Sequence, residues 1–249
     1  MIFMKILLAP SETKTLYKDT NFDIDSLLFA NLLPQRKDIL EKYNEIIKDN
    51  NPEEIKEMFG LKKDNDIAQY LKTIDNQSPA CKAIKLYTGI AFDYLKYDLL
   101  ETKAKIYIEK NVIIFSNLFG PVLAGDTLPL YRLQQGENVR DKKTDEIYKK
   151  YSSSLLDEYL RDDDILDIRA GYYDKFYIPT KNYTTLKFLK DGKVVSHWAK
   201  AYRGKVLREC AKNDIQNTKD FLALNIEGLQ IIELQTKKNK TEVIYEIGI

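Results

Sequence analysis

The stretch NVIIFS, residues 111–116, decides the fold class. It is short, apolar and rich in β-branched residues, which is typical of a strand buried on both faces of a sheet. The runs KILLAP (5–10) and DILDIRAG (164–171) have the same character. Because these runs lie far apart in the sequence, with helical patterns between them, we expect a central sheet of buried strands flanked by helices.

Helical periodicity fills much of the chain between these runs. In residues 36–48, apolar side chains recur at the i, i+1, i+4, i+7 and i+8 positions of an amphipathic helix. Residues 51–60 have an Asn cap, a Pro in the first turn and a terminal Gly. We expect further helices over 66–74, 145–160 and 199–212, and a helix starting at Ser78 and Pro79 in the segment 78–89.

Two hairpins are predicted in the C-terminal part. Residues 184–198 contain two apolar runs around Asp191-Gly192, and residues 229–247 alternate around a polar turn. The chain shows no internal repeat or obvious linker. The sequence therefore predicts a single α+β (mixed α/β) domain over 1–249, with a mixed, partly antiparallel sheet flanked by helices.

Composition sets the broad class. Charged residues at 31% and hydrophobic residues at 44% describe a soluble globular protein. Cys81 and Cys210 are the only cysteines, so a disulfide framework is not expected. The apolar N-terminal run is short and interrupted by Lys5, and no stretch has the length of a membrane span. We expect a cytoplasmic protein without a membrane partner, and we expect a monomer.

Several chemistries lack their residues. His197 is the only histidine, which argues against His-rich metal sites, and no nucleophile elbow accompanies it for a serine triad. There is no Walker loop, Gly-x-Gly-x-x-Gly or Cys-x-x-Cys, so no cofactor and no metal are expected. The acidic run 162–164 is interpreted as a solvated turn.

The charge distribution is uneven. Residues 181–212 hold nine cations and two carboxylates, a local net charge of +7 on a chain whose total is +1. Such polarisation favours a basic face for a polyanion, although a solvated helix face is an equally good reading of the count alone. Trp198 and Tyr202, beside these cations, could stack on bases or pack in the core.

Four motifs in order resemble the YaaA family of peroxide-stress proteins. They are LLAPSETKTL (7–16), LYTGI (86–90), IIFSNLFGPVLAGDTLPLYRL (113–133) and WAKAYRG (198–204). The resemblance covers essentially the whole chain. Phe119 stands where the family often has tyrosine, and RAGYYDK (169–175) replaces a Ser-x-Glu-Tyr type segment, although Tyr173 and Lys175 match in character.

The resemblance implies a cytoplasmic bacterial protein that limits peroxide damage and lowers unincorporated iron. It also implies DNA binding through a basic cleft beside a helix-hairpin-helix element, for which residues 115–126 are the candidate hairpin. The expected partner is duplex or distorted duplex DNA with weak sequence preference. The predicted DNA-binding residues are Gly120, Gly125, Arg132, Lys200, Arg203, Gly204, Lys205 and Arg208.

An enzyme acting on nucleic-acid bases or nucleotides is the alternative to a binder without turnover. The clustered polar motif residues exceed what a phosphate grip needs, and a buried lysine can act as a nucleophile. The catalytic candidates are Lys14, Asp126 and Lys200; the other motif residues are Ser11, Tyr87, Gly89, Ser116, Tyr131, Tyr173 and Lys175. Arg132 lies in an apolar stretch and needs an anion, for which Asp126 is the nearest candidate, so an Asp-Arg brace is expected.

Overall fold

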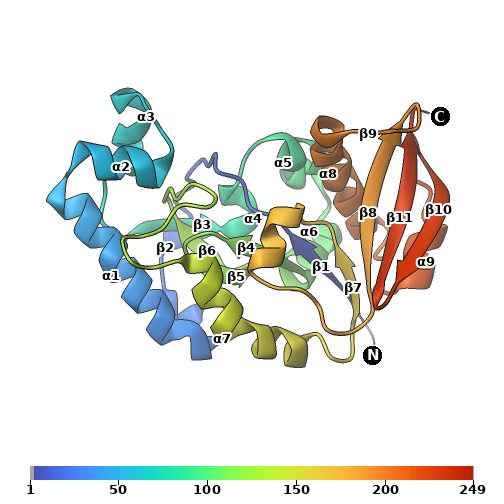
Figure 1. Cartoon of the computed structure of the whole chain (residues 1–249), viewed down its shortest axis with the longest axis horizontal. Coiled ribbons are helices and arrows are strands. Elements are labelled where there is room, and N and C mark those ends of the chain that lie inside the picture. The colour runs from blue at the N-terminus through green and yellow to red at the C-terminus, as the bar shows by residue number, and fades with distance from the viewer. Residues whose placement is uncertain (1–2, 249) are drawn as a thin grey trace.

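A computed structural model describes residues 3–248, and it describes only the backbone of Ser196 and His197. Within this part of the chain, the larger sheet has eight strands in the order β10-β11-β8-β7-β1-β4-β5, with β9 paired to β8 (Figure 1). The strand bounds are β1 Met4–Leu8, β4 Val112–Ser116, β5 Gly120–Leu123, β7 Asp164–Asp167, β8 Tyr183–Lys190, β9 Lys193–Val194, β10 Leu229–Lys237 and β11 Lys240–Ile247.

Strand direction divides this sheet into a parallel centre and antiparallel additions. The neighbours β4-β1-β7-β8-β11 are all parallel, whereas β5, β9 and β10 pair antiparallel with β4, β8 and β11. The three buried runs found in the sequence are the adjacent strands β4, β1 and β7, and every residue of β1 is buried. The prediction of a mixed, partly antiparallel sheet is confirmed.

The chain order creates a switch point in the sheet. From β1 the chain proceeds to β4 on one side, whereas β7, β8 and β11 follow one another on the other side. The loops after β1 and β7 therefore diverge at the carboxyl ends of two neighbouring parallel strands. In open α/β sheets, ligands bind in the crevice formed at such a point.

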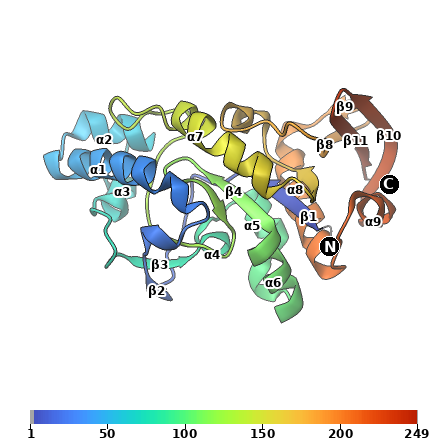
Figure 2. The same cartoon turned by 90° about the horizontal axis from the view of Figure 1, so that it is seen from below.

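Helices cover both faces of this sheet. In Figure 2, α7 and α6 lie on opposite sides of the region containing β1 and β4, and α1 to α3 lie at the end away from the β10–β11 hairpin. The buried apolar side chains form one contiguous core cluster. The helix bounds are α1 Leu33–Asp49, α2 Pro52–Phe59, α3 Asp64–Ile67, α4 Ala83–Leu86, α5 Ile90–Leu95, α6 Thr102–Asn111, α7 Thr144–Tyr159, α8 Ser196–Lys212 and α9 Thr218–Ala223, with short 3-10 turns η1 Ile24–Ser26, η2 Ala30–Leu32, η3 Ala68–Tyr70, η4 Tyr97–Leu99 and η5 Gly171–Lys175.

A small sheet corrects the prediction of a helix starting at Ser78. It consists of β2 Thr20–Asn21, β3 Pro79–Lys82 and β6 Thr127–Pro129 in the order β2-β3-β6. The segment 78–89 therefore begins as the middle strand of three, and only Ala83–Leu86 is helical. Ala80 and Cys81 are fully buried in this strand, so tertiary contacts outweigh the local helix signal.

The expected helix-hairpin-helix element is not formed by residues 115–126. These residues belong to the antiparallel β4–β5 hairpin, in which Ser116 pairs with Gly120 and Ile113 with Leu123. Gly120 has φ +71°, and a β-carbon there would lie 2.4 Å from the Tyr148 ring. Packing inside the core requires this glycine, and the prediction of a helix-hairpin-helix element at this segment is wrong.

None of the helices in residues 3–248 is both long enough and apolar enough to cross a membrane.

Candidate functional site

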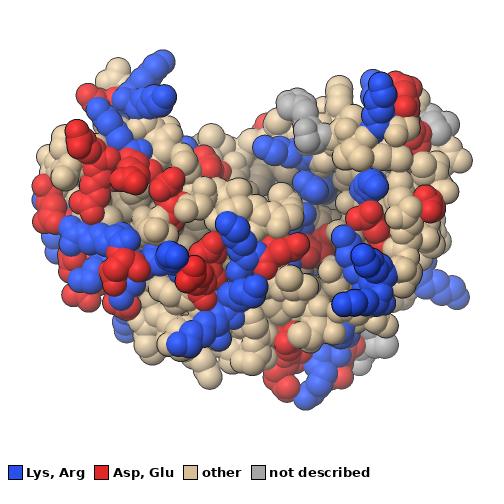
Figure 3. Space-filling view, viewed as in Figure 1, with Lys and Arg blue, Asp and Glu red and all other residues tan. Residues whose placement is uncertain are grey.

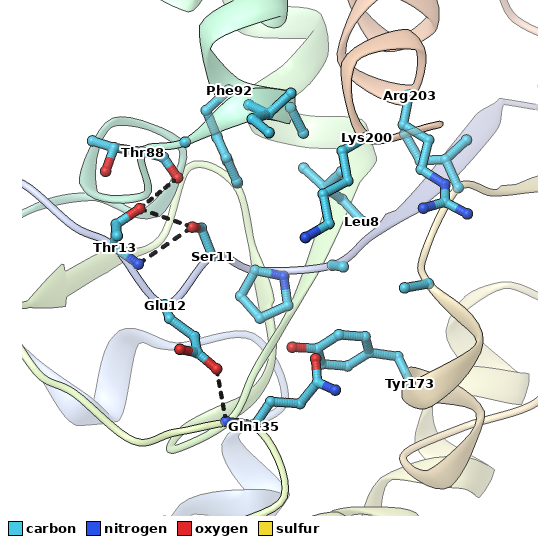
Figure 4. Close-up of a pocket in the computed structure, with 17 residues that line it drawn as sticks. Leu8, Ser11, Glu12, Thr13, Thr88, Phe92, Gln135, Tyr173, Lys200 and Arg203 are labelled. Atoms are coloured by element: carbon cyan, nitrogen blue, oxygen red, sulfur yellow. Dashed lines mark hydrogen bonds between the residues drawn. The ribbon is translucent and has the colours of Figure 1, made fainter. Parts of the chain in front are cut away.

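A pocket of about 370 Å³ lies at the switch point between β1 and β7. Its walls come from the loop after β1, the segment after β7, the start of α5, and α8, as the close-up in Figure 4 shows. The lining residues are Leu8, Ala9, Pro10, Ser11, Glu12, Thr13, Thr88, Gly89, Ile90, Ala91, Phe92, Gln135, Ile168, Ala170, Tyr173, Lys200 and Arg203. Three of the four sequence motifs, together with the segment 169–175, thus meet around one small cavity.

The pocket is part of a larger hollow. Figure 3 shows the molecule hollowed between the lobe that carries α2 and α3 and the side that carries α5 and α8. Lys and Arg side chains gather on the α5 and α8 side, whereas carboxylates gather over α2. The α5 and α8 side of the hollow is therefore basic, whereas both signs of charge occur on the lobe that carries α2 and α3.

Close packing of two helices fixes the cationic wall. A β-carbon at Gly204 would lie 1.9 Å from the Ala91 carbonyl oxygen, so this glycine allows α8 to pack directly against α5. Arg208 donates to the carbonyl oxygens of Leu95 and Lys96, at the C-terminal end of α5, at 2.8 and 3.0 Å. Gly204 and Arg208 therefore position α8, and the backbone that approaches Gly204 belongs to α5.

Hydroxyl groups shape the opposite wall. The Ser11 and Thr13 hydroxyl oxygens lie 3.1 Å apart, and the Thr13 hydroxyl donates to the Thr88 carbonyl at 3.2 Å. The Thr88 amide in turn donates to the Thr13 carbonyl at 3.0 Å. Gly89 follows with φ +101°, a conformation that favours glycine, and a β-carbon there would lie 3.2 Å from the Ser11 hydroxyl. These contacts join the SETK and LYTG motifs.

Lys200 and Arg203 face the pocket from α8 (Figure 4). The Lys200 amine points into the space between Ser11 and Tyr173. Arg203 is largely buried, and its Nε atom is buried without a hydrogen-bond partner. Burial lowers the pKa of Arg203, and the negative charge of Asp167 opposes this effect. Within the described residues, these two cations lack the carboxylate contacts that neutralise cations elsewhere in the chain.

Among the arginines of the described residues, only Arg203 has a buried side-chain atom without a hydrogen-bond partner. The chain has seven, and each of the other six donates at least one hydrogen bond to a protein oxygen: Arg36, Arg132, Arg140, Arg161, Arg169 and Arg208. Asp167, the carboxylate that acts on Arg203, is already engaged by Arg169 in two hydrogen bonds of 2.9 and 2.7 Å. A buried donor without a partner costs free energy in the folded chain.

A buried polar network supports the loop after β1. The Lys14 amine donates to the carbonyl oxygens of Ser11 and Glu12 at 3.1 and 3.2 Å and lies 4.3 Å from the centre of the Tyr131 ring. The Tyr131 hydroxyl is 2.7 Å from both the Tyr87 and the Ser116 hydroxyl oxygens. Burial, and next the charge of Arg132, lower the pKa of Lys14 to about 7, with Glu12 acting in the opposite direction.

The anion that pairs with Arg132 is Glu12, which corrects the predicted Asp126–Arg132 brace. Arg132 donates to the Glu12 carboxylate at 3.1 Å and to the Phe59 carbonyl at 2.6 Å. Asp126 instead accepts from the Leu28 and Leu123 amides, each at 2.9 Å. Burial raises the pKa of Asp126, and these amide donors oppose the shift. Asp126 thus holds backbone amides, and it does not line the pocket.

Comparison with known proteins assigns the family. A sequence model of the peroxide stress protein YaaA matches residues 4–234. The chain belongs to the YaaA family. An uncharacterized protein of Campylobacter jejuni is 44% identical over 245 residues, which cover 98% of this chain and 99% of that protein. UPF0246 proteins of Fusobacterium nucleatum and Corynebacterium efficiens are 28% identical over 247 residues (95% and 97% of the two chains) and 30% identical over 223 residues (86% and 88%). The resemblance found in the sequence motifs is confirmed.

The structure separates the site residues predicted for this YaaA-family chain. Lys200 and Arg203 line the pocket together with Ser11, Gly89 and Tyr173. Lys205 instead forms an ion pair with Glu227 at 3.3 Å, and a β-carbon at Gly125 would lie 3.1 Å from the Glu109 carbonyl oxygen. Lys175 is exposed, with its amine 4.9 Å from the centre of the Tyr172 ring. Gly120, Gly125, Gly204, Lys205 and Arg208 therefore have structural partners within the chain.

Sequence reasoning missed the pocket residues Glu12, Thr13, Thr88, Phe92 and Gln135. Glu12, Thr13 and Thr88 lie inside the motifs, but the predicted functional residues there included only their neighbours, such as Lys14 and Tyr87. Phe92 and Gln135 carried no local signal, because only the tertiary fold brings them to the switch point. The side chain of His197, the single histidine, lies outside the described part of the chain. Within that part, no group of three or more His, Cys, Asp or Glu residues could hold a metal ion.

Proposed function

We propose that this YaaA-family protein acts in the peroxide-stress response by binding DNA, with Lys200 and Arg203 holding a backbone phosphate in the hollow. The observation that carries the proposal is Arg203, a largely buried arginine whose Nε has no partner and which lines a pocket beside a second cation. A phosphate accepts charge-assisted hydrogen bonds from both groups and would satisfy the buried donor.

The polarity of the hollow supports the same proposal. Cations gather on the α5 and α8 side (Figure 3), where a polyanion can lie against the protein. Phosphate contacts carry no sequence information, so we expect weak sequence preference. We further propose a cytoplasmic site of action and a lowering of unincorporated iron, both of which the family resemblance implies.

The test compares cations on one helix. We expect Lys200→Ala together with Arg203→Met to weaken duplex binding about tenfold or more and to reduce the slope of log affinity against log salt by about one to two. Lys205→Ala is the matched control, because Lys205 lies on the same helix but pairs with Glu227. Fluorescence anisotropy with labelled duplex at several salt concentrations measures both quantities. Equal affinity and slope for the double variant and the wild type would remove the phosphate role.

The geometry also bears on the enzyme alternative. The Lys14 amine, whose pKa near 7 suits a nucleophile, is directed to two carbonyl oxygens and is not among the pocket-lining groups. Asp126 is engaged with backbone amides elsewhere. Of the three catalytic candidates only Lys200 reaches the pocket, so binding is the function that the geometry favours.

A further inference from the structure

The pocket is too small for the ligand that the hollow as a whole would take. Its volume is about 370 Å³. This lies within the range of small-molecule sites, about 300–1,000 Å³. A duplex cannot enter it, because a duplex is wider than its own major groove, which is about 12 Å wide. Arg203 nevertheless lines this small space, so the ligand that contacts it there must be a single unit of a chain or a free small molecule.

The walls of the pocket divide into chemically different parts. Lys200 and Arg203 form a cationic side on α8, and the Ser11 and Thr13 hydroxyls lie across the pocket from them (Figure 4). The Phe92 ring enters between these sides, and apolar side chains such as Leu8 and Ile168 complete the wall. A cation pair therefore adjoins an aromatic ring and apolar surface. That combination suits a ligand with a phosphate at one end and a flat ring at the other.

We infer that the pocket takes one unpaired nucleotide, with its phosphate between Lys200 and Arg203 and its base against Phe92. The inference rests on the proposed function and deepens it, since it names the unit that the site accepts. The nucleotide has two possible sources, a free nucleoside monophosphate and a nucleotide extruded from a DNA strand. Extrusion is least costly where the base is mismatched or already unpaired, so a strand source predicts preference for distorted DNA.

The first test uses free ligands and the wild-type protein. Isothermal titration calorimetry with thymidine monophosphate, inorganic phosphate, ribose 5-phosphate and thymidine separates the contributions of phosphate and base. We expect thymidine monophosphate to bind at least about tenfold more tightly than each of the other three, because only it engages both the cations and the ring. If ribose 5-phosphate binds as tightly as thymidine monophosphate, the base is not recognised and the inference is wrong.

The second test uses two aromatic residues of α5. Phe92→Leu keeps an apolar side chain in the pocket but removes the ring, whereas Tyr94→Leu makes a comparable change at an exposed residue that does not line the pocket. We expect Phe92→Leu to weaken thymidine monophosphate binding about fivefold to tenfold and to leave inorganic phosphate binding unchanged. Tyr94→Leu should change neither. Equal loss for both ligands, or no loss for either, would contradict a base seated on Phe92.

DNA probes identify the source of the nucleotide. Anisotropy is measured with a paired duplex and with the same duplex carrying one unpaired thymidine. Tighter binding of the second probe, lost in Phe92→Leu, supports extrusion from the strand; equal binding combined with tight thymidine monophosphate binding supports the free nucleotide. Equal binding of both probes with no preference for thymidine monophosphate overturns the inference, and the proposed phosphate role of Lys200 and Arg203 then stands or falls separately on their own variants.

Discussion

Replacing Arg203 with methionine should separate stability from ligand binding. Arg203 lies on α8, its Nε is buried without a hydrogen-bond partner, and burial lowers its pKa. Methionine keeps an unbranched apolar stem of similar reach but removes the charge and the unsatisfied donor. The variant therefore removes a group whose burial costs free energy in the folded state. On the proposal above, the same group binds a phosphate.

The expected magnitude follows from the unsatisfied group. A buried donor without a partner costs about 1–3 kcal/mol, and the loss of some stem contacts offsets part of this gain. We expect the free energy of unfolding of Arg203→Met to equal that of the wild type or to exceed it by about 1 kcal/mol.

Arg169→Met is the matched comparison. Arg169 is 5% exposed and donates two hydrogen bonds to Asp167 as well as bonds to the Tyr173 and Tyr177 carbonyls. Its removal leaves Asp167 buried without its partner, which should cost about 3–5 kcal/mol. Urea denaturation followed by circular dichroism measures both variants, and anisotropy measures DNA affinity on the same preparations.

A specific result would refute the reasoning. If Arg203→Met loses several kcal/mol, comparable to about 3–5 kcal/mol for Arg169→Met, then Arg203 is a structural arginine with partners inside the fold. A stable Arg203→Met variant with unchanged DNA affinity would show instead that the unpaired donor does not serve DNA.

Three further predictions concern other parts of the site. Burial lowers the pKa of Lys14 from 10.5 to about 7, so between these values the unfolded chain binds one more proton than the folded chain, and wild-type stability rises with pH. The stability of the wild type relative to Lys14→Met should thus increase by about 1.4 kcal/mol per pH unit through that window, measured by urea titrations at several pH values, and a difference independent of pH would refute the shift. Gly204→Ala places a β-carbon 1.9 Å from the Ala91 carbonyl and should lower the melting temperature by several degrees, about what a loss of 1–3 kcal/mol produces, whereas an unchanged melting temperature would mean that α5 and α8 are not in close contact. Asp126→Asn disturbs the acceptor of the Leu28 and Leu123 amides and should cost about 1–2 kcal/mol in chemical denaturation while DNA affinity stays within about twofold, and a loss of affinity at full stability would return Asp126 to the site.

The parts of the fold that sequence reasoning predicted are those in which local pattern and tertiary role agree. The apolar runs at 5–8, 112–116 and 164–167 are strands because their residues are buried on both faces, and α1 and α7 follow strong helical periodicity. The segment 79–82 was predicted as a helix because Pro79 resembles a helix start. It forms a strand because two partners enclose it.

Several residues of the candidate site could be predicted from the sequence, but the contacts between them could not. The motifs named Lys14, Lys200 and Arg203, but the pairing of Arg132 with Glu12 joins residues 120 positions apart and left no trace in local spacing. Charge counting could not distinguish Arg203 from Arg208 on the same helix, because the difference lies in the carbonyl oxygens that Arg208 reaches at the end of α5.

Protection of lysines from chemical modification tests the central claim most directly. The protein is treated with a limiting amine-acetylating reagent in the presence and absence of DNA, and the modified lysines are quantified by mass spectrometry. Lys200 lines the pocket, whereas Lys212 lies on the same helix and pairs with Glu209 away from it. We expect bound DNA to reduce acetylation of Lys200 strongly and to leave that of Lys212 unchanged. Equal acetylation of Lys200 with and without DNA, while anisotropy shows the DNA to be bound, would contradict it.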